Sequence, residues 1–328
     1  MNVLLILPDA ENPHGVYEGA LRAAFPDLSV NCVDHHDKVG PYVGAADVLM
    51  TFSPFMADHV ARDATRLQWI QVLGSGVDGF VDLPSLRRDV VITNGRGVQA
   101  APVSEAALSL MLALSRELPR MLANQTVRSW ERWPSQLLEG CTLGILGVGQ
   151  IGEALALKAR AFGMRVIGVS TGTRSVPAFE RLYPREQLRD AVAEMDFFVV
   201  LTPYSADTHH IVDASVLARM KPEAFLVNLA RGGVVNEPDL ARALRANTIR
   251  GAALDVFQKE PLPSDSELWS LPNVIISPHM SGLNSSYPRS ILPLVIDNVA
   301  LFRAGRRDQM RNIVTNPGFL PGADSTNR

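Results

Sequence analysis

The stretch Gly144-Ile145-Leu146-Gly147-Val148-Gly149-Gln150-Ile151-Gly152 decides the fold of this chain. It joins an apolar strand pattern to the helical pattern Gln150–Phe162 through three glycines spaced G-x-G-x-x-G. The first glycine permits a tight turn, the second lets a pyrophosphate approach the backbone, and the third lets helix and strand pack closely. The helix N-terminus adds N–H groups and a positive dipole. The predicted phosphate contacts are Gly147, Gly149, Gln150, Ile151 and Gly152.

Glycines also serve ordinary structural turns, so the context of this motif matters. A further strand pattern, Arg165–Val169, completes a strand–turn–helix–strand unit within about 30 residues. That complete unit favours a dinucleotide-binding site over a merely structural turn.

Strand and helix patterns alternate on both sides of this unit. One series of apolar strand patterns begins at Val3–Leu7 and ends at Val90–Thr93, and a second begins at Leu143–Leu146 and ends at Val274–Ile276. Such alternation indicates parallel sheets covered by helices on both faces. With 328 residues, enough for about two domains, the chain is predicted to form two α/β domains.

Between the two series, Ala101–Leu118 forms a helical pattern that is apolar almost all round. We expect Ser104 to cap its N-terminus and Pro119 to mark its end. A helix of this kind has to be buried on every side, either between domains or in a dimer interface.

Composition excludes several classes of partner. Lys and Arg number 31 and Asp and Glu 34, giving a formal net charge of −3, and the pI is near 6.2. We therefore expect neither nucleic acid nor a membrane as a partner. The two cysteines, Cys32 and Cys141, are too few for a disulfide framework or a four-ligand zinc site, and they favour a reducing, cytoplasmic setting. The opening residues Met1–Pro8 lack a cationic leader and predict a strand rather than a signal peptide.

Arg231, Glu260 and His279 each stand a few residues after a buried strand pattern, where open α/β sheets place ligands. Singly, each has an ordinary structural explanation: a surface ion pair, a turn residue and a core histidine. Together they supply a fixed cation, a carboxylate and an imidazole beside a dinucleotide site.

At this point the sequence resembles the D-isomer-specific 2-hydroxyacid dehydrogenases, and the resemblance covers nearly the whole chain. The matching motifs are Leu67–Gln71, Gly74–Asp78, Thr93–Gly95, Val103–Glu105, Gly147–Gly152, Thr202–Pro203, Met220–Lys221, Asn228–Gly232, Leu254–Val256, Glu260–Leu262 and Pro278–His279. One departure is Ser104, where the family commonly has alanine.

The resemblance implies two doubly wound parallel-sheet domains, with a Rossmann cofactor domain inserted into a flavodoxin-like substrate domain. We predict a substrate-binding domain at residues 1–98 and 284–328 and an NAD(P)-binding domain at residues 99–283. Since the family commonly pairs through the cofactor domain, a homodimer is expected.

The implied activity is hydride transfer between a nicotinamide cofactor and a small D-2-hydroxy acid or 2-oxo acid. His279 would donate a proton to the carbonyl oxygen in reduction and accept it in oxidation. Glu260 would fix the ring tautomer and favour the imidazolium. Arg231 would bind the substrate oxygens through its planar fork. No metal is required, because the cofactor carries the hydride.

Further contacts are implied by the resemblance. The turn Ser75, Gly76 and Val77 would offer backbone N–H groups to the substrate carboxylate. Asp255 would contact the nicotinamide and Pro203 the adenine. The remaining predicted cofactor contacts are Ser170, Thr171, Arg174, Thr202, Thr208, Leu229, Ala230, Arg231 and His279.

The choice between NADP and NAD is predicted from a missing carboxylate. In this fold an Asp or Glu about 20 residues beyond the glycine turn binds the adenosine ribose and repels a 2′-phosphate. Here no carboxylate occurs between Val169 and Glu180. Ser170, Thr171 and Thr173 can instead donate hydrogen bonds to a phosphate, and Arg174 can pair with its charge. We favour NADP, and a solvent-facing polar loop would leave NAD possible.

Two alternatives stay open on the same fold. A non-catalytic NAD(P)-sensing protein similar to the C-terminal-binding corepressors could keep all three catalytic residues, although the near-neutral charge and the lack of long disordered tails disfavour it. A reductase of other carbonyls would leave Arg231 unexplained. Without a regulatory extension of the kind some phosphoglycerate dehydrogenases carry, the chain is expected to reduce glyoxylate or hydroxypyruvate.

Overall fold

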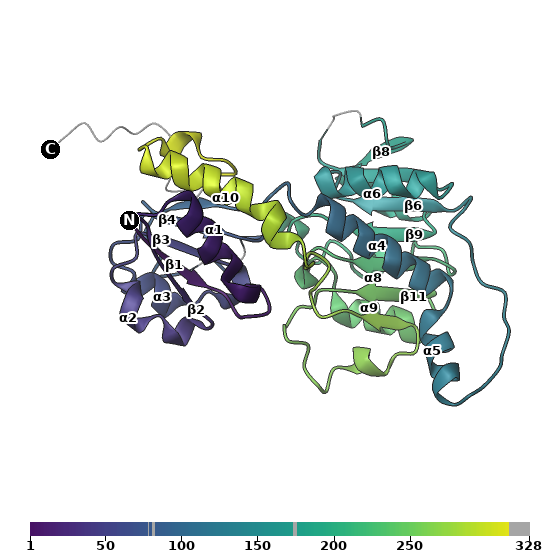
Figure 1. The fold of residues 1–328 in the computed structure, drawn as a ribbon. Helices are drawn as coiled ribbons and strands as arrows, with labels where there is room; N and C mark the ends of the chain where they lie inside the picture. The colour runs from purple at the N-terminus through teal and green to yellow at the C-terminus, as the bar shows by residue number, and fades with distance from the viewer. Residues whose placement is uncertain (78, 81–82, 173–175, 315–328) are drawn as a thin grey trace. The chain divides into compact units, whose positions relative to one another are not determined.

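The computed structural model describes residues 1–77, 79–80, 83–172 and 176–314, which form two compact units (Figure 1). Of these residues, unit 1 comprises 1–99 and 284–314, and unit 2 comprises 100–283. The chain thus enters unit 2 once and returns to unit 1 for its last helix. Substrate binding by unit 1 and cofactor binding by unit 2 remain predictions.

Unit 1 is built on a parallel sheet whose strand order, within the described residues, is β2-β1-β3-β4-β5. The strands are β1 (Asn2–Ile6), β2 (Ser29–Val33), β3 (Val48–Thr51), β4 (Trp69–Val72) and β5 (Val91–Thr93). Strands β3, β4 and β5 are buried along their whole length, because the sheet is covered on both faces.

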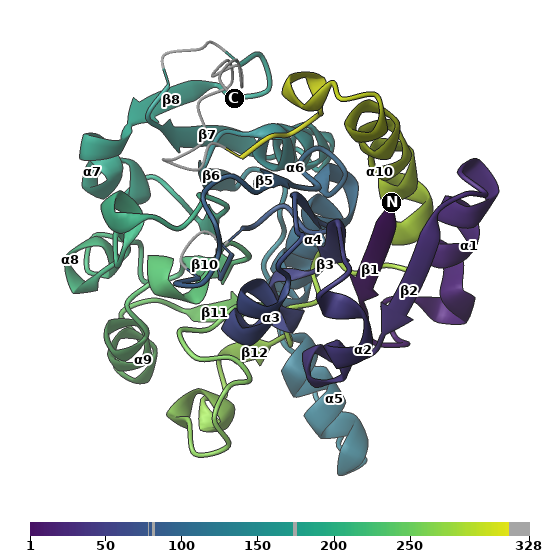
Figure 2. The ribbon, with the colours of Figure 1, turned by 90° about the vertical axis from the view of Figure 1, so that its left-hand side faces the viewer.

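Successive side chains of β1 point to opposite faces, and each face has its own helices. Helices α1 (Val16–Ala24) and α10 (Tyr287–Arg303) pack together on the face that contains Leu5 (Figure 2). Helices α2 (Gly40–Val43) and α3 (Asp58–Asp63) line the other face. Unit 1 is therefore wound on both sides of its sheet.

Unit 2 is built on a longer parallel sheet, with the order β12-β11-β10-β9-β6-β7-β8 among the described residues. The strands are β6 (Thr142–Leu146), β7 (Arg165–Ser170), β8 (Arg181–Pro184), β9 (Phe197–Val200), β10 (Phe225–Asn228), β11 (Gly251–Leu254) and β12 (Val274–Ile276). The winding reverses between β6 and β9, and open α/β sheets bind ligands at the carboxyl ends of strands beside such a switch point.

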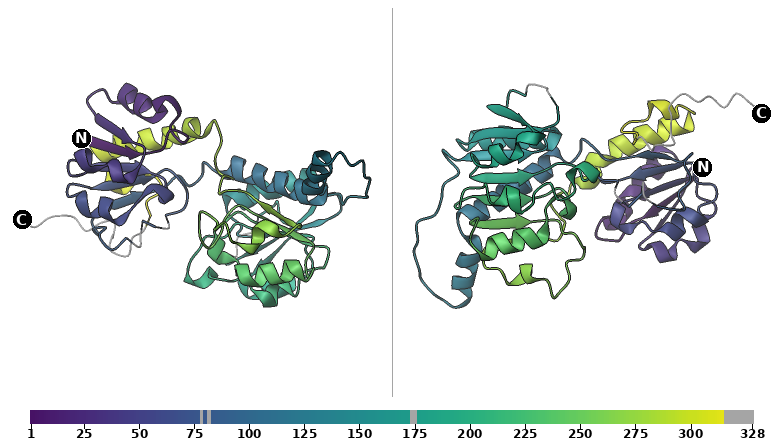
Figure 3. Two further views of the ribbon diagram at one scale, coloured as in Figure 1. Left: turned by 90° about the horizontal axis from the view of Figure 1, so that it is seen from below. Right: turned by 180° about the vertical axis from the view of Figure 1, so that it is seen from behind.

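Helices cover both faces of the second sheet as well. The helices are α4 (Ala100–Ser115), α5 (Leu118–Thr126), α6 (Gln150–Ala161), α7 (Leu188–Val192), α8 (Ala214–Leu217) and α9 (Glu237–Arg245). Helices α4 and α6 lie side by side on one face, and α7, α8 and α9 contribute to the core of the other (Figures 1 and 3). The predicted doubly wound α/β fold is confirmed in both units. A membrane crossing would need a longer apolar helix than any in the described part of the chain.

Strand β8 was not predicted from the sequence. Only Tyr183 of its residues is buried, while Arg181 and Pro184 are exposed. The strand lies at the edge of the sheet and pairs with β7 alone. An edge strand with a single buried side chain lacks the apolar run that identifies its neighbours.

Helix α4 differs from expectation at both ends and in its burial. Ser104 lies inside the helix, where its hydroxyl donates to the Ala100 carbonyl (2.6 Å) and accepts a hydrogen bond from Lys158 of α6 (2.8 Å). The predicted N-cap is therefore wrong. The helix ends at Ser115, and Pro119 lies in the first turn of α5. Exposed Glu105 and Ser109 show that α4 is not buried on every side within one chain.

Candidate active site

Arg231 follows strand β10, and the buried Asn228 shapes the turn that carries it. The Asn228 side chain accepts a hydrogen bond from the Ala230 N–H (3.2 Å) and donates one to the Arg231 carbonyl (3.2 Å). The Arg231 guanidinium donates to the Ala230 carbonyl at 2.8 Å. At Gly232 a Cβ atom would lie 1.9 Å from the carbonyl carbon of Phe257. Only glycine therefore lets this turn pack against the backbone that follows β11.

Glu260 and His279 form a hydrogen-bonded pair after strands β11 and β12. His279 Nδ1 lies 2.6 Å from Glu260 Oε2, and Glu260 Oε1 accepts the Phe257 N–H at 2.9 Å. Burial pushes the pKa of Glu260 upward, but these hydrogen bonds and the positive charges of His279 and Arg231 lower it overall. The three predicted catalytic residues are thus brought together in unit 2, with an ionised carboxylate against the imidazole.

The backbone of His279 is held in an unusual conformation. Its φ is +52°, in the left-handed region that a histidine rarely adopts. The Asp255 carbonyl accepts the His279 N–H at 2.8 Å. The buried Asp255 carboxylate accepts hydrogen bonds from the Ser277 hydroxyl (2.6 Å), the Met280 N–H (2.9 Å) and the Ser281 N–H (3.0 Å). Asp255 therefore shapes the turn around His279, a role that the sequence did not reveal. Its predicted nicotinamide contact stays a prediction.

Sequence reasoning also missed a second carboxyl group beside Glu260. Glu237, in the first turn of α9, accepts a hydrogen bond from the Gln258 N–H. Burial raises the pKa of Glu237, and the nearby negative charge of Glu260 raises it further. An acidic residue in the first turn of a helix is ordinary, so its position gave no signal of a role at the site.

The glycine turn after β6 has the geometry that phosphate binding needs. Gly147 has a φ of +108°, and a Cβ there would lie 2.7 Å from the Thr202 nitrogen. A Cβ on Gly152 would lie 2.5 Å from the Gly147 carbonyl oxygen. At Gly149, by contrast, a Cβ would meet no described atom within 4 Å. Packing thus requires two of the glycines, and open space over the third fits a cofactor phosphate at the α6 N-terminus beside Gln150 and Ile151.

The other predicted cofactor residues follow neighbouring strands. Ser170 ends β7 and accepts the Gly172 N–H at 3.1 Å, while Thr171 is exposed. After β9, the buried Thr208 donates to the Pro203 carbonyl at 2.8 Å. Thr202 after β9, and Leu229 and Ala230 after β10, are buried. Thr173 and Arg174 lie outside the described residues.

The predicted substrate turn belongs to unit 1, where it follows β4. The carbonyl oxygens of Leu73 and of the turn residues that follow it all accept hydrogen bonds. Side chains donate three of them: the Tyr287 hydroxyl to Leu73, the Asn94 amide to Ser75 (2.8 Å) and the Ser53 hydroxyl to Gly76 (3.0 Å). Backbone N–H groups donate the other two, Gly95 to Gly74 (2.7 Å) and Phe80 to Val77 (3.0 Å). Within the described part of the chain, the N–H groups of residues 74–77 donate no hydrogen bond. The turn thus has four N–H groups without an acceptor among the described residues, and its binding of a substrate carboxylate stays a prediction.

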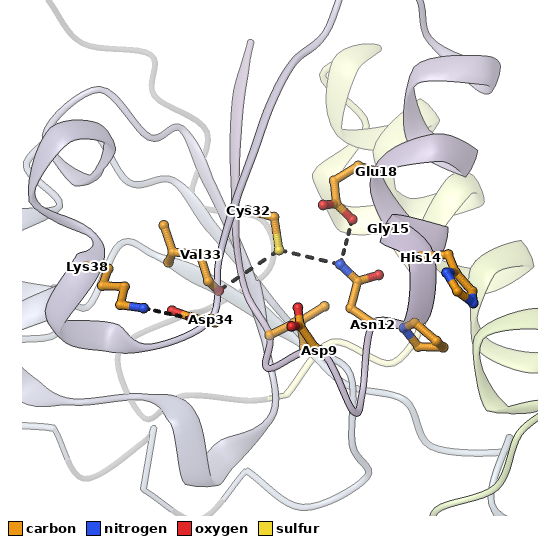
Figure 4. A pocket seen from close by; sticks show the side chains of 11 residues that line it. Asp9, Asn12, His14, Gly15, Glu18, Cys32, Val33, Asp34 and Lys38 are labelled. Carbon is orange, nitrogen blue, oxygen red and sulfur yellow. Dashed lines mark hydrogen bonds and ion pairs between the residues drawn. The ribbon is translucent and has the colours of Figure 1, made fainter.

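A separate cavity of about 790 Å³ lies at the carboxyl ends of β1 and β2, and Figure 4 shows its lining. Asn12 donates to Glu18 (2.7 Å) and contacts the Cys32 sulfur, and Lys38 donates to Asp34 (2.7 Å). Burial raises the pKa of Cys32 to about 12, so its thiol is a poor nucleophile. None of the predicted site residues lines this cavity.

Comparison with known proteins bears on the whole chain. Residues 108–281 match the family model of the D-isomer specific 2-hydroxyacid dehydrogenase, NAD binding domain. A glyoxylate/hydroxypyruvate reductase B from Pectobacterium atrosepticum is 34% identical over 304 residues, covering 90% of this chain and 91% of that protein.

Two solved structures cover nearly all of the fold. A D-isomer specific 2-hydroxyacid dehydrogenase family protein from Aeromonas salmonicida has a TM-score of 0.87 and 36% identity, covering 96% of this chain and 99% of that one. An NADPH-dependent glyoxylate/hydroxypyruvate reductase from Sinorhizobium meliloti, solved with NADP and sulfate, has a TM-score of 0.82 and 27% identity, covering 97% and 99%.

Proposed function

Because the chain belongs to the D-isomer-specific 2-hydroxyacid dehydrogenase family, we propose that it interconverts a small 2-oxo acid and the matching D-2-hydroxy acid, with His279 as general acid and base. The enzyme class, an NAD(P)-dependent D-2-hydroxyacid dehydrogenase, follows from that membership. When bound, the nicotinamide supplies the hydride in reduction and takes it back in oxidation.

The 2.6 Å contact between His279 Nδ1 and Glu260 Oε2 supports this role most directly. Since Nδ1–H is donated to an ionised carboxylate, Nε2 is the ring nitrogen left to exchange a proton with the substrate. In reduction Nε2–H protonates the carbonyl oxygen, and in oxidation Nε2 takes the proton from the hydroxyl. Arg231 binds the substrate oxygens as a fixed cation.

The proposed substrates are glyoxylate and hydroxypyruvate. Support comes from the reductases of Pectobacterium atrosepticum and Sinorhizobium meliloti, which are named for these two acids. The unused N–H groups of Ser75, Gly76 and Val77 would bind the carboxylate that both acids carry.

The proposed cofactor is NADP in preference to NAD. Glu180, the first carboxylate after β7, lies 2.8 Å from Arg165 and is engaged in that ion pair. Ser170 and Thr171 supply hydroxyl donors at the end of β7, where the ribose of a dinucleotide binds in this fold. The related reductase from Sinorhizobium meliloti was solved with NADP.

The proposed assembly is a homodimer formed through α5 and the segment that follows it. Exposed apolar side chains concentrate there: Leu118, Met121, Leu122, Val127, Trp130 and Leu137. Trp130 is 94% exposed, and the segment runs along the outside of unit 2 (Figure 3). A concentration of exposed apolar groups on one segment is typical of an interface, and a second copy is the simplest closed partner.

A rate measurement tests the function. The purified chain is mixed with NADPH or NADH and a panel of 2-oxo acids, and the loss of reduced cofactor is followed by absorbance. We expect turnover of glyoxylate or hydroxypyruvate, faster with NADPH, and a D-configured product wherever the acid yields a chiral centre. Tight binding of NADPH without turnover of any 2-oxo acid would instead support a nucleotide-sensing protein.

A further inference from the structure

We infer that Ser53 and Tyr287 are positioning residues that hold the turn Gly74–Val77 in the shape that binds the substrate carboxylate. The inference rests on the proposed function, because it assumes that this turn receives a 2-oxo acid. It goes further by assigning specificity for the carboxylate to side chains that do not themselves touch substrate.

The local sequence of the turn does not by itself favour one backbone conformation. It contains Gly74 and Gly76, and glycine loses more conformational freedom on ordering than any other residue. A loop that is ordered only when ligand arrives subtracts that cost from the binding free energy, whereas a loop that is already ordered does not. What orders the turn therefore decides how well it binds.

The contacts that order the turn are hydrogen bonds to its carbonyl oxygens. Ser53 reaches the Gly76 carbonyl at 3.0 Å, and the Tyr287 hydroxyl donates to the Leu73 carbonyl. Asn94 donates to the Ser75 carbonyl between them, at 2.8 Å. The carbonyls of the turn are engaged by protein, whereas the N–H groups of residues 74–77 donate to no acceptor in the described part of the chain. Consecutive N–H groups of this kind can bind an anion.

Ser53 and Tyr287 reach the turn from different elements. Ser53 follows β3, and Tyr287 is the first residue of α10, far along the sequence. Tyr287 is 4% exposed, and burial raises the pKa of its hydroxyl, so it remains a donor at all working pH values. Removal of either hydroxyl should loosen one end of the turn without touching Arg231, Glu260 or His279.

The test compares Ser53→Ala and Tyr287→Phe with the wild-type enzyme. Each variant loses one hydrogen bond, so we expect the KM for glyoxylate to rise about threefold to tenfold. The dissociation constant of oxalate, measured by titration of the enzyme–NADPH complex, should rise by a similar factor. The kcat, the KM for NADPH and the pH profile should stay close to wild type, because the catalytic residues keep their contacts.

Two controls separate positioning from general damage. Ser53→Thr keeps a hydroxyl and should restore the KM. Ser290→Ala removes a hydroxyl of α10 that donates to the carbonyl of Ser286, the residue just before the helix. Unchanged glyoxylate KM and oxalate affinity in both test variants would overturn the inference, as would an equal loss in Ser290→Ala. If Ser53→Ala does not fold, Tyr287→Phe alone decides.

Failure of the proposed function gives a different result. If the wild-type enzyme reduces no 2-oxo acid, the premise is wrong. If the wild-type enzyme reduces a 2-oxo acid, and both variants have the same glyoxylate KM and oxalate affinity as wild type, the positioning role alone is wrong.

Discussion

His279 is the side chain on which the proposed chemistry depends. General acid–base catalysis contributes about 10²- to 10⁴-fold to rate, so His279→Ala should lower kcat for 2-oxo acid reduction by that factor. The KM for the cofactor should change little. Initial rates with saturating NADPH and glyoxylate measure this, and a near-normal kcat in the alanine variant would end the mechanism.

We predict that Glu260 sets the pH range of the proposed reaction. The pKa of Glu260 lies below its ordinary value, so it stays ionised through the neutral range and loses its charge only in more acidic solution. In Glu260→Gln the imidazolium has no negative partner, and the proton donor for reduction is lost at lower pH. We expect the pH dependence of kcat/KM for reduction to move downward, as rates across a series of buffers would show. An unshifted profile would separate Glu260 from the proton donor.

Arg174 determines the cofactor preference in the sequence-based hypothesis, although it lies outside the described residues. A hydrogen bond to a charged group contributes about 1.5–3 kcal/mol, and about 1.4 kcal/mol corresponds to a factor of ten. Arg174→Ala should therefore raise the KM for NADPH at least tenfold and leave that for NADH nearly unchanged. A wild-type enzyme that clearly prefers NADH would contradict the assignment.

The turn after β12 is stabilised by one buried carboxylate. Asp255 accepts three hydrogen bonds around His279, two of them from backbone N–H groups. In asparagine an NH2 group replaces one carboxylate oxygen, and this group cannot accept a hydrogen bond. Asp255→Asn should lower the free energy of unfolding by about 1–3 kcal/mol. Urea denaturation measures the loss, and Asp265→Asn, at an exposed position of the same unit, is the matched control that should leave stability unchanged.

The proposed homodimer is tested by changing a residue of α5, within the exposed apolar segment. Wild-type protein should sediment at twice the 35.7 kDa of one chain at micromolar concentration. Leu122→Glu places a charge among the exposed apolar side chains and should shift the equilibrium toward the monomer, because the charge would lose its water on association. Arg189→Glu on α7, on the other face of the sheet, is the control. A wild-type monomer at these concentrations would refute the dimer.

Several features of the fold and the candidate site could be predicted from the sequence alone. Strand and helix patterns alternate along the chain, and this alternation predicted both parallel sheets. The three glycines after β6 predicted the turn because Gly147 and Gly152 have no room for a side chain. Arg231, Glu260 and His279 were predicted because the ends of parallel strands meet at one edge of a sheet.

Other features depend on contacts between distant segments, which no local pattern records. Tyr287 reaches a carbonyl 214 positions away, and Glu237 approaches Glu260 only because α9 begins beside the segment after β11. Ser104 is a residue type that favours the N-cap position of a helix, yet it lies inside α4, where it accepts a hydrogen bond from Lys158 of α6. Local sequence determines which elements form, because their patterns repeat over a few residues. Tertiary packing decides which groups support each predicted catalytic side chain, because hydrogen-bond partners have to be close in space rather than in sequence.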